Sequence, residues 1–306
     1  MRWSTSVSAA ALLLISFCMT APLMAQNPSD QRSQADTLFQ QNNFNEALTL
    51  YRQLLLLPAK DPRHAQDLEK SIACLQHLGR VSEADGLIEQ SVAAHPGDFH
   101  LLMQAGNSFA SLEKFGFLIA GKFERGGHRG GGQQVQVEAR DRIRSIQLCL
   151  QALAAAEDGQ SVSATEHANA WLRLGESISS ERYSEAWKLQ DLTDLTVLPD
   201  PEPGFPWMFR GRGMGSPVSG APVDPEGRPV FHRVPQSWVA ATSDGERWRW
   251  AMSEAARLDP KRRSEIELSW AGFLQSQFGT GSGGAELPPP VVPLGKAADA
   301  AADQPR

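Results

Sequence analysis

The strongest constraint on the fold is an order of apolar and small residues that recurs along the first two thirds of the chain. Residues 171–178 read W-L-R-L-G-E-S-I, and residues 35–58 carry alanines, leucines and a tyrosine in a related order that ends at Pro58. The small residues have a physical role, because two helix backbones that cross closely leave no room for a side chain larger than that of Ala35 or Ala47. An internal repeat of this kind predicts one structural unit that packs against its neighbours several times over.

The repeat resembles that of tetratricopeptide proteins, whose first helix has the signature W-x2-L-G-x2-Y. Trp171, Leu174 and Gly175 match this signature, and Ile178 stands where the family has tyrosine. The resemblance covers residues 31–195 and implies a mainly α-helical fold of helical hairpins stacked as an α-solenoid. It also implies a concave surface that binds another protein or a peptide, with no enzymatic activity and no cofactor or metal of its own.

Four units are expected in this region, two of them regular. The first spans residues 35–58, and the second ends at His95-Pro96. The third begins with the first-helix pattern of Leu102, Gly106, Phe109 and Phe115 and then departs from it, because Leu118 occupies the position of a small residue. The fourth is expected to carry a second helix with Tyr183, Ala186 and Leu189.

A glycine-rich basic stretch interrupts the third unit. Residues 121–132 contain six glycines, and each glycine costs a helix about 1 kcal/mol relative to alanine. The stretch is therefore expected to be a loop or a hinge, with a helix resuming near Val137. Lys122, Arg125 and Arg129 lie on it, either as solvated side chains or as ligands for an acidic peptide or a glycan.

The resemblance also implies which side chains face a bound partner. These first-helix positions are occupied by Arg32, Asp36, Phe39, His100, Met103 and Asn107. Asn107 matches the asparagine that grips C-terminal carboxylates in one variety of the family, but Met103 replaces the expected lysine. The sequence therefore does not favour that kind of clamp.

The second half of the chain changes in composition. Residues 196–236 are rich in proline and glycine, which excludes a continuing repeat helix, and the turn sequence at residues 224–227 predicts a small β-hairpin. Two closing helices are expected in residues 237–279, the first beginning with the capping box of Ser243 and Glu246. Trp250 either packs beneath the proline-rich segment or forms an exposed interface anchor. Residues 280–306 are expected to be a disordered tail.

The amino terminus and the overall charge indicate a compartment. Arg2, an apolar run at residues 9–19 and small residues at Ala21 and Ala25 are typical of a secretory signal peptide, so residues 1–25 predict export to the periplasm or beyond. No later stretch is apolar enough to span a membrane. The formal net charge of −6 disfavours nucleic acid as a partner. Cys74 and Cys149, the cysteines beyond the signal, are expected to be buried or paired with each other.

A second, weaker resemblance concerns the amino-terminal region of large bacterial α2-macroglobulin-like envelope proteins. It depends on residues 120–132 and on S-D-G-E-R-W-R-W at residues 243–250. It would make the chain the recruiting module of a protease-trapping system. A further alternative is an accessory of an envelope hydrolase with its site in residues 198–279, where Asp224, Glu226, Asp244 and Glu246 are the available carboxylates. The function predicted first remains an exported protein-interaction scaffold.

Overall fold

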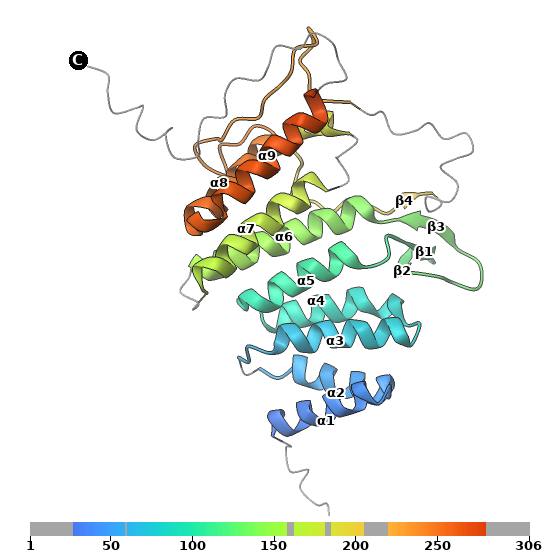
Figure 1. Ribbon diagram of the computed structural model, residues 1–306. Helices are drawn as coiled ribbons and strands as arrows, with labels where there is room; N and C mark the ends of the chain where they lie inside the picture. Colours follow the sequence, from blue (N-terminus) through green and yellow to red (C-terminus); the bar gives the residue numbers. More distant parts are fainter. Residues whose placement is uncertain (1–26, 59, 158–161, 181–184, 205–219, 280–306) are drawn as a thin grey trace, which may run out of the picture.

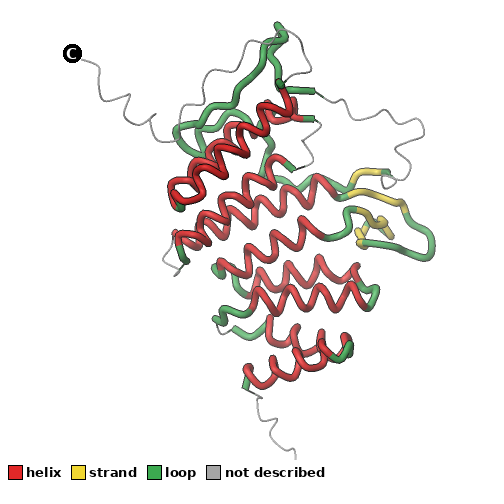
Figure 2. Tube along the Cα trace, viewed as in Figure 1, coloured by secondary structure: helices red, strands yellow, loops and turns green. Residues whose placement is uncertain are grey.

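The computed structural model describes residues 27–58, 60–157, 162–180, 185–204 and 220–279. The predicted signal peptide, the predicted tail and Tyr183 lie outside these residues. The described chain is mainly helical with one small antiparallel sheet (Figure 1, Figure 2). None of the helices that the structure describes combines the length and apolar character that crossing a membrane requires.

The first four helices form where the first two units are expected. Two tight connections separate α1 from α2 and α3 from α4, and Asn42 takes the left-handed conformation between α1 and α2 with a φ of 61°. Ala35 and Ala47 are fully buried, as the close helix crossing requires. The bounds are α1 (Pro28–Gln40), α2 (Phe44–Leu55), α3 (His64–His77), the short 3-10 helix η1 (Val81–Glu83) and α4 (Ala84–Ala94).

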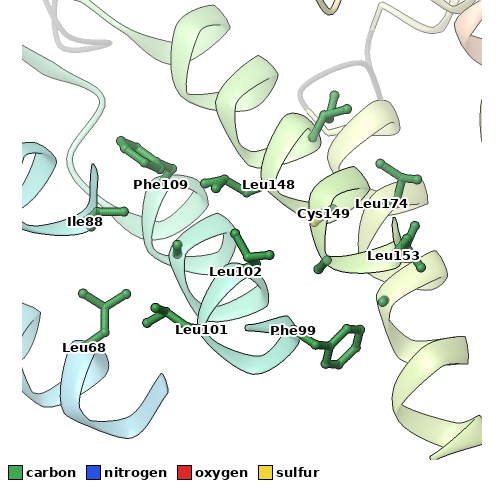
Figure 3. Packing of buried hydrophobic residues seen from close by; sticks show 14 of the residues in the cluster. Leu68, Ile88, Phe99, Leu101, Leu102, Phe109, Leu148, Cys149, Leu153 and Leu174 are labelled. Atoms are coloured by element: carbon green, nitrogen blue, oxygen red, sulfur yellow. The ribbon is translucent and has the colours of Figure 1, made fainter. Parts of the chain in front are cut away.

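Three further helices continue the succession along the molecule (Figure 1). They are α5 (Phe99–Ser111), α6 (Glu138–Glu157) and α7 (Ala164–Ser179). Leu102 of α5, Cys149 of α6 and Leu174 of α7 share the apolar core between these helices (Figure 3). Cys74 and Cys149 are both buried free thiols and do not form a disulfide with each other.

The partner of α7 differs from the expectation. Only the short 3-10 helix η2 (Ala186–Gln190) forms where the second helix of the fourth unit is predicted. Helix α7 packs instead on α8 (Asp244–Leu258), where Gly175 contacts Trp248 and Met252. A Cβ atom at Gly175 would lie too close to Met252 Cε, so the missing side chain permits this crossing.

The closing pair of helices is confirmed. After α8, the 3-10 helix η4 (Pro260–Arg262) leads into α9 (Arg263–Phe278). The buried face of α9 consists of the expected residues Ile266, Trp270, Phe273 and Leu274. The predicted capping box is half formed, because Ser243 accepts from the Glu246 backbone while the Glu246 carboxylate accepts from Thr242.

The glycine-rich stretch is part of a sheet and not only a loop, which corrects the prediction. The strands are β1 (Phe115–Ile119), β2 (Lys122–Arg125), β3 (Gln133–Gln136) and β4 (Glu202–Pro203), and they pair antiparallel in the order β2-β1-β3-β4. Ala120 and Gly121 form the turn between β1 and β2 with φ angles of 49° and 80°, as a two-residue hairpin requires. Phe115 and Leu118 accordingly lie in a strand and not in a repeat helix.

The hairpin predicted around residues 224–227 is reduced to a turn with a single bridge. Gly227 takes a φ of 80°, and Val223 pairs with Pro229 in an isolated antiparallel bridge. Prolines limit the ladder because they donate no backbone hydrogen bond. The turn is therefore confirmed, while no strand is assigned on either side of it in the described residues.

Candidate functional site: two adjoining hollows

An apolar hollow lies between α7, α8 and α9. Its volume is about 220 Å³. Polar and charged side chains from α7, η4 and α9 surround an apolar floor. The floor consists of Leu172, Leu189, Trp248, Met252, Ile266 and Phe273, and the rim of Glu176, Ser179, Arg262, Glu265 and Ser269.

Aromatic side chains of α8 and α9 pack against each other in this floor. The rings of Trp248 and Phe273 lie 5.0 Å apart, centre to centre, and those of Trp248 and Trp270 lie 5.2 Å apart. Arg262 fixes the rim, because its guanidinium donates to Glu265 and to Asn169 of α7. The hollow is thus formed by helices, and its shape is set by their contacts in the core.

A second hollow, which is basic, lies where α5, α6 and α7 meet. Its volume is about 200 Å³. Three cationic side chains and one carboxylate line it together with small and hydroxyl side chains. The lining residues are Ala110, Lys114, Arg142, Ser145, Arg173, Glu176, Ser177 and Ser180.

Each cation of the basic hollow is positioned by protein contacts. Lys114 Nζ donates to the Phe109 carbonyl oxygen at 2.5 Å. Arg142 donates to the Ile178 carbonyl oxygen at 3.4 Å and thereby joins α6 to the end of α7. Arg173 donates from Nη1 to Glu176 at 2.9 Å, while its buried Nε has no hydrogen-bond partner in the described part of the chain.

The two hollows adjoin at Glu176. This residue lines both of them, and Arg173 and Leu172 precede it on the same helix, one facing the basic hollow and the other the apolar one. A single extended molecule can therefore contact both. Apolar side chains form much of the lining of one hollow, and charged and hydroxyl side chains form most of the lining of the other.

A third hollow lies between α6, η2 and β4 and is polar. Its volume is about 420 Å³, and Glu138, Glu185, Asp200 and Glu202 contribute carboxylates beside Arg140 and Lys188. No group of three or more His, Cys, Asp or Glu residues in the described ranges is arranged to hold a metal ion.

The carboxylates expected for a hydrolase accessory do not meet in any of these hollows. Asp224 accepts from the Arg228 side chain in the exposed turn, and Glu226 does the same. Asp244 is buried at the start of α8 and accepts from the Thr193 backbone at 3.0 Å. Glu246 pairs with Arg233 at 2.9 Å. Each carboxylate thus serves a turn or a helix start.

The predicted binding residues of the first unit make internal contacts. Arg32 is buried and forms ion pairs with Asp67 and Asp61, so it is inaccessible to a partner, contrary to the prediction. Asp36 accepts from Tyr51 and Lys70 at 2.6 Å each. Burial alone would raise the pKa of Asp36, but these hydrogen bonds and the nearby charges lower it below its usual value. Phe39 packs edge-on against Phe44.

The predicted residues of α5 are more accessible. Met103 and Asn107 are partly exposed, and they lie on the helix that also supplies Ala110 to the basic hollow. His100 lies 3.0 Å from Glu166 of α7. Hydrogen bonds from Ser163, followed by the one with His100, lower the pKa of Glu166 to about 2. Binding by these three residues of α5 stays a prediction.

Arg125 is not a loop residue, which corrects the prediction for the glycine-rich stretch. Its side chain is 0% exposed and pairs with Asp85 of α4 at 2.6 Å and with Asp141 of α6 at 2.7 Å. Burial acts to lower the pKa of Arg125, but the hydrogen bonds and charges of the two aspartates raise it above its ordinary value. Lys122 and Arg129 are exposed and remain available to a partner.

Trp250 is partly buried and packs against the main core, and it lines neither hollow.

The sequence did not single out Lys114, Arg142 or Arg173 of the basic hollow. These cations come from three different helices, and only the approach of α5, α6 and α7 brings them together. Leu172 and Glu176 could have been found from the sequence, because they flank the recognised residues of α7.

No protein-family model, curated protein or solved structure matches this chain.

Proposed function

We propose that this chain is an exported protein-interaction scaffold whose partner binds across the two adjoining hollows. The tetratricopeptide-like order of residues 31–195 supports this proposal, since repeats of that family present side chains to other proteins. Export is supported by the signal-peptide character of residues 1–25. We include in this proposal that residues 31–195 form tetratricopeptide-like repeats.

The observation that carries the proposal is the position of Glu176 between an apolar and a basic hollow. Protein interfaces derive much of their energy from apolar and aromatic anchors in pockets, surrounded by a polar rim. The apolar hollow has such a floor in Trp248 and Phe273 and such a rim in Ser179 and Ser269. The hollow is formed between helices, and a preformed site reduces the entropy lost when a partner binds.

Site-specific photocrosslinking in the native envelope tests this proposal. A photoreactive amino acid replaces Ser269 on the rim of the apolar hollow or Ser180 in the basic hollow, and the complete chain including residues 1–25 is expressed. We expect the same partner to be crosslinked from both positions. The matched control places the photoreactive residue at Thr49, an exposed position of α2 outside both hollows.

Two outcomes would contradict the proposal. Equal crosslinking from Thr49 and from the hollow positions would show that the hollows are not the binding surface. Retention of the chain in the cytoplasmic fraction would contradict export, whatever the crosslinks show.

A further inference from the structure

We propose that the guanidinium of Arg249 is a docking site for the C-terminal segment of the same chain, and that the carboxylate of Glu286 binds there. The segment would then fold back over the contact between α8 and α9. Arg249 lines neither of the two hollows, so this site is separate from the proposed partner site.

Arg249 of α8 is a buried cation without an anionic partner among the described residues. The residue is only 7% exposed, and its guanidinium carbon lies 4.0 Å from the ring centre of Trp270 on α9. Burial lowers the pKa of Arg249 to about 10, and no carboxylate in the described part of the chain acts to raise it. A contact with an aromatic ring offsets only part of the cost of removing a charge from water, so an anionic partner is expected.

The neighbouring carboxylates of α8 are engaged elsewhere. Glu246, one turn before Arg249, accepts from the side chain of Arg233 and from the backbone of Thr242. Glu254, five residues after Arg249, accepts from Arg257. The anion that Arg249 requires must therefore come from outside the described residues.

The orientation of the guanidinium leaves two donors for such an anion. Nε of Arg249 is completely enclosed and has no hydrogen-bond partner in the described ranges, whereas Nη1 and Nη2 are not enclosed in this way. Two terminal nitrogens of one guanidinium match the two oxygens of a carboxylate. A carboxylate is thus the group that suits this site.

The sequence offers few carboxylates that could serve. Residues 205–219 contain neither Asp nor Glu, and Asp158 and Glu181 lie in the short connections that follow α6 and α7. Glu286 is the first carboxylate after α9, the helix that carries Trp270. Position in the chain therefore favours Glu286.

The length of chain after α9 is sufficient for this contact. Phe278 packs edge-on against Phe231 with ring centres 5.3 Å apart, so the C-terminal segment begins beside the residue that precedes His232. Electrostatic coupling of His232 to Arg249 places both near one another. Eight helical residues from Trp270 to Phe278 rise about 12 Å, whereas the eight residues that lead to Glu286 span up to about 26 Å when extended.

The residues that follow Glu286 favour an ordered contact. Leu287 is followed by three consecutive prolines at positions 288–290. Proline restricts the backbone of the unbound segment, so less conformational entropy is lost when the segment docks. The expectation of disorder for residues 280–306 would then apply only beyond this contact.

Urea unfolding of the full-length chain and its variants tests the pairing. We expect E286Q to lower the urea midpoint, because it leaves Arg249 buried without an anion. In the R249Q background the same substitution should shift the midpoint no further, since the cation is already absent. D299N, which removes another carboxylate of the same segment, is the matched control and should leave the midpoint unchanged.

Photocrosslinking of the full-length chain tests the location. A photoreactive amino acid replaces Leu287, and peptide mapping identifies the residues that it reaches. We expect crosslinks within one chain to residues 231–233 and to α8 near Arg249, with a yield several-fold lower in R249Q. The R249K variant keeps the charge but not the fork, and should give an intermediate yield. Circular dichroism establishes that each variant is folded.

Four outcomes would overturn the assignment to Glu286. They are an unchanged urea midpoint in E286Q, a loss of stability in E181Q instead, equal crosslinking yields in R249Q and the parent chain, and crosslinks from position 287 that reach only a second chain or another protein. The proposed function does not depend on this result, because the photoreactive residues at positions 269 and 180 report on the hollows alone.

Discussion

The first two helical pairs and the next two differ in what separates their helices. Helices α1 and α2, and likewise α3 and α4, follow each other after a few residues, whereas residues 112–137 separate α5 from α6 and residues 180–243 separate α7 from α8. Helix α6 nevertheless packs on α5 and α8 packs on α7, as α2 packs on α1, whereas α3 packs more on α2 and α5 than on α4. A long connection therefore does not prevent two consecutive helices from packing together, and a short connection does not ensure that they do.

The two long connections are held to the helices by buried polar groups. In the first connection, Arg125 at the end of β2 pairs with Asp85 and Asp141. In the second, Asp244 accepts from Thr193, and His232 lies against Gly245 at the start of α8. Apolar packing holds the helices together, while specific charge and hydrogen-bond contacts fix the segments inserted between them.

The largest expected effect on the free energy of unfolding comes from breaking the ion pairs of Arg125, which hold the first connection to the helices. We expect R125Q to lower the free energy of unfolding by about 3–5 kcal/mol, because it leaves Asp85 and Asp141 without their buried cationic partner. Urea unfolding of the variant and the parent chain measures this difference.

Arg129 provides the matched control for R125Q. It lies in the same stretch but is exposed, so R129Q should change the free energy of unfolding by less than about 0.5 kcal/mol. Equal effects of the two substitutions would mean that the sheet is not fixed by Arg125, and that the glycine-rich stretch behaves as the sequence alone suggests.

The glycine-rich stretch, which was predicted to be a loop or a hinge, shows that composition alone does not determine secondary structure. Six glycines in residues 121–132 exclude a stable helix, yet they do not exclude a strand with a tight turn, and Gly121 takes the positive φ of that turn. The burial of Arg125 depends on Asp85, which lies 40 residues away, and on Asp141. A local reading of the sequence cannot detect a charge pair of that separation.

The helices and their small residues were predictable because they depend on local spacing. Gly106 and Gly175 occupy the same position of the first-helix pattern, and both lie against the next packed helix. The hollows were less predictable, since Trp248 of α8 and Phe273 of α9 reach α7 only after residues 180–243 have returned the chain to it. The sequence therefore indicated binding by α7 but not the chemistry of its neighbours.

Substitutions of Gly106 in α5 and Gly175 in α7 are expected to have an intermediate effect on the free energy of unfolding, and they compare the packing of these two helices. We expect G106V and G175V each to lower the free energy of unfolding by roughly 2–3 kcal/mol, because a larger side chain would overpack the crossing. A Cβ at Gly106 meets the Ser145 carbonyl oxygen at 3.3 Å, and one at Gly175 meets Trp248 Cδ1 at 3.2 Å as well as Met252. Chemical denaturation measures both values.

Gly86 of α4 is the control, since a Cβ there meets nothing within 4 Å. G86V should leave stability unchanged or raise it by a few tenths of a kcal/mol, because valine has a better helix propensity than glycine. A loss in G106V without a loss in G175V would show that α8 packs on α7 more loosely than α6 packs on α5.

The smallest expected effect concerns the second connection and depends on pH. His232 is buried, its Nε2 has no hydrogen-bond partner among the described residues, and its ring contacts Gly245. Burial lowers the pKa of His232 to about 4; the nearby Glu246 carboxylate acts to raise it, and the Arg249 guanidinium adds to the lowering. In the unfolded chain the pKa of histidine is about 6.5.

Between these two pKa values the unfolded chain binds a proton that the folded chain does not. The stability contributed by neutral His232 is therefore fully present above about pH 6.5 and is lost as the pH falls toward 4. We expect acidification from pH 7 to pH 5 to cost roughly 1–2 kcal/mol through this residue. Urea unfolding across this range should show a flatter pH dependence in H232Q, in which every other titrating group is retained. Parallel pH profiles of the two chains would mean that His232 is protonated as readily in the folded chain as in the unfolded one, and that the second connection is held less tightly than the first.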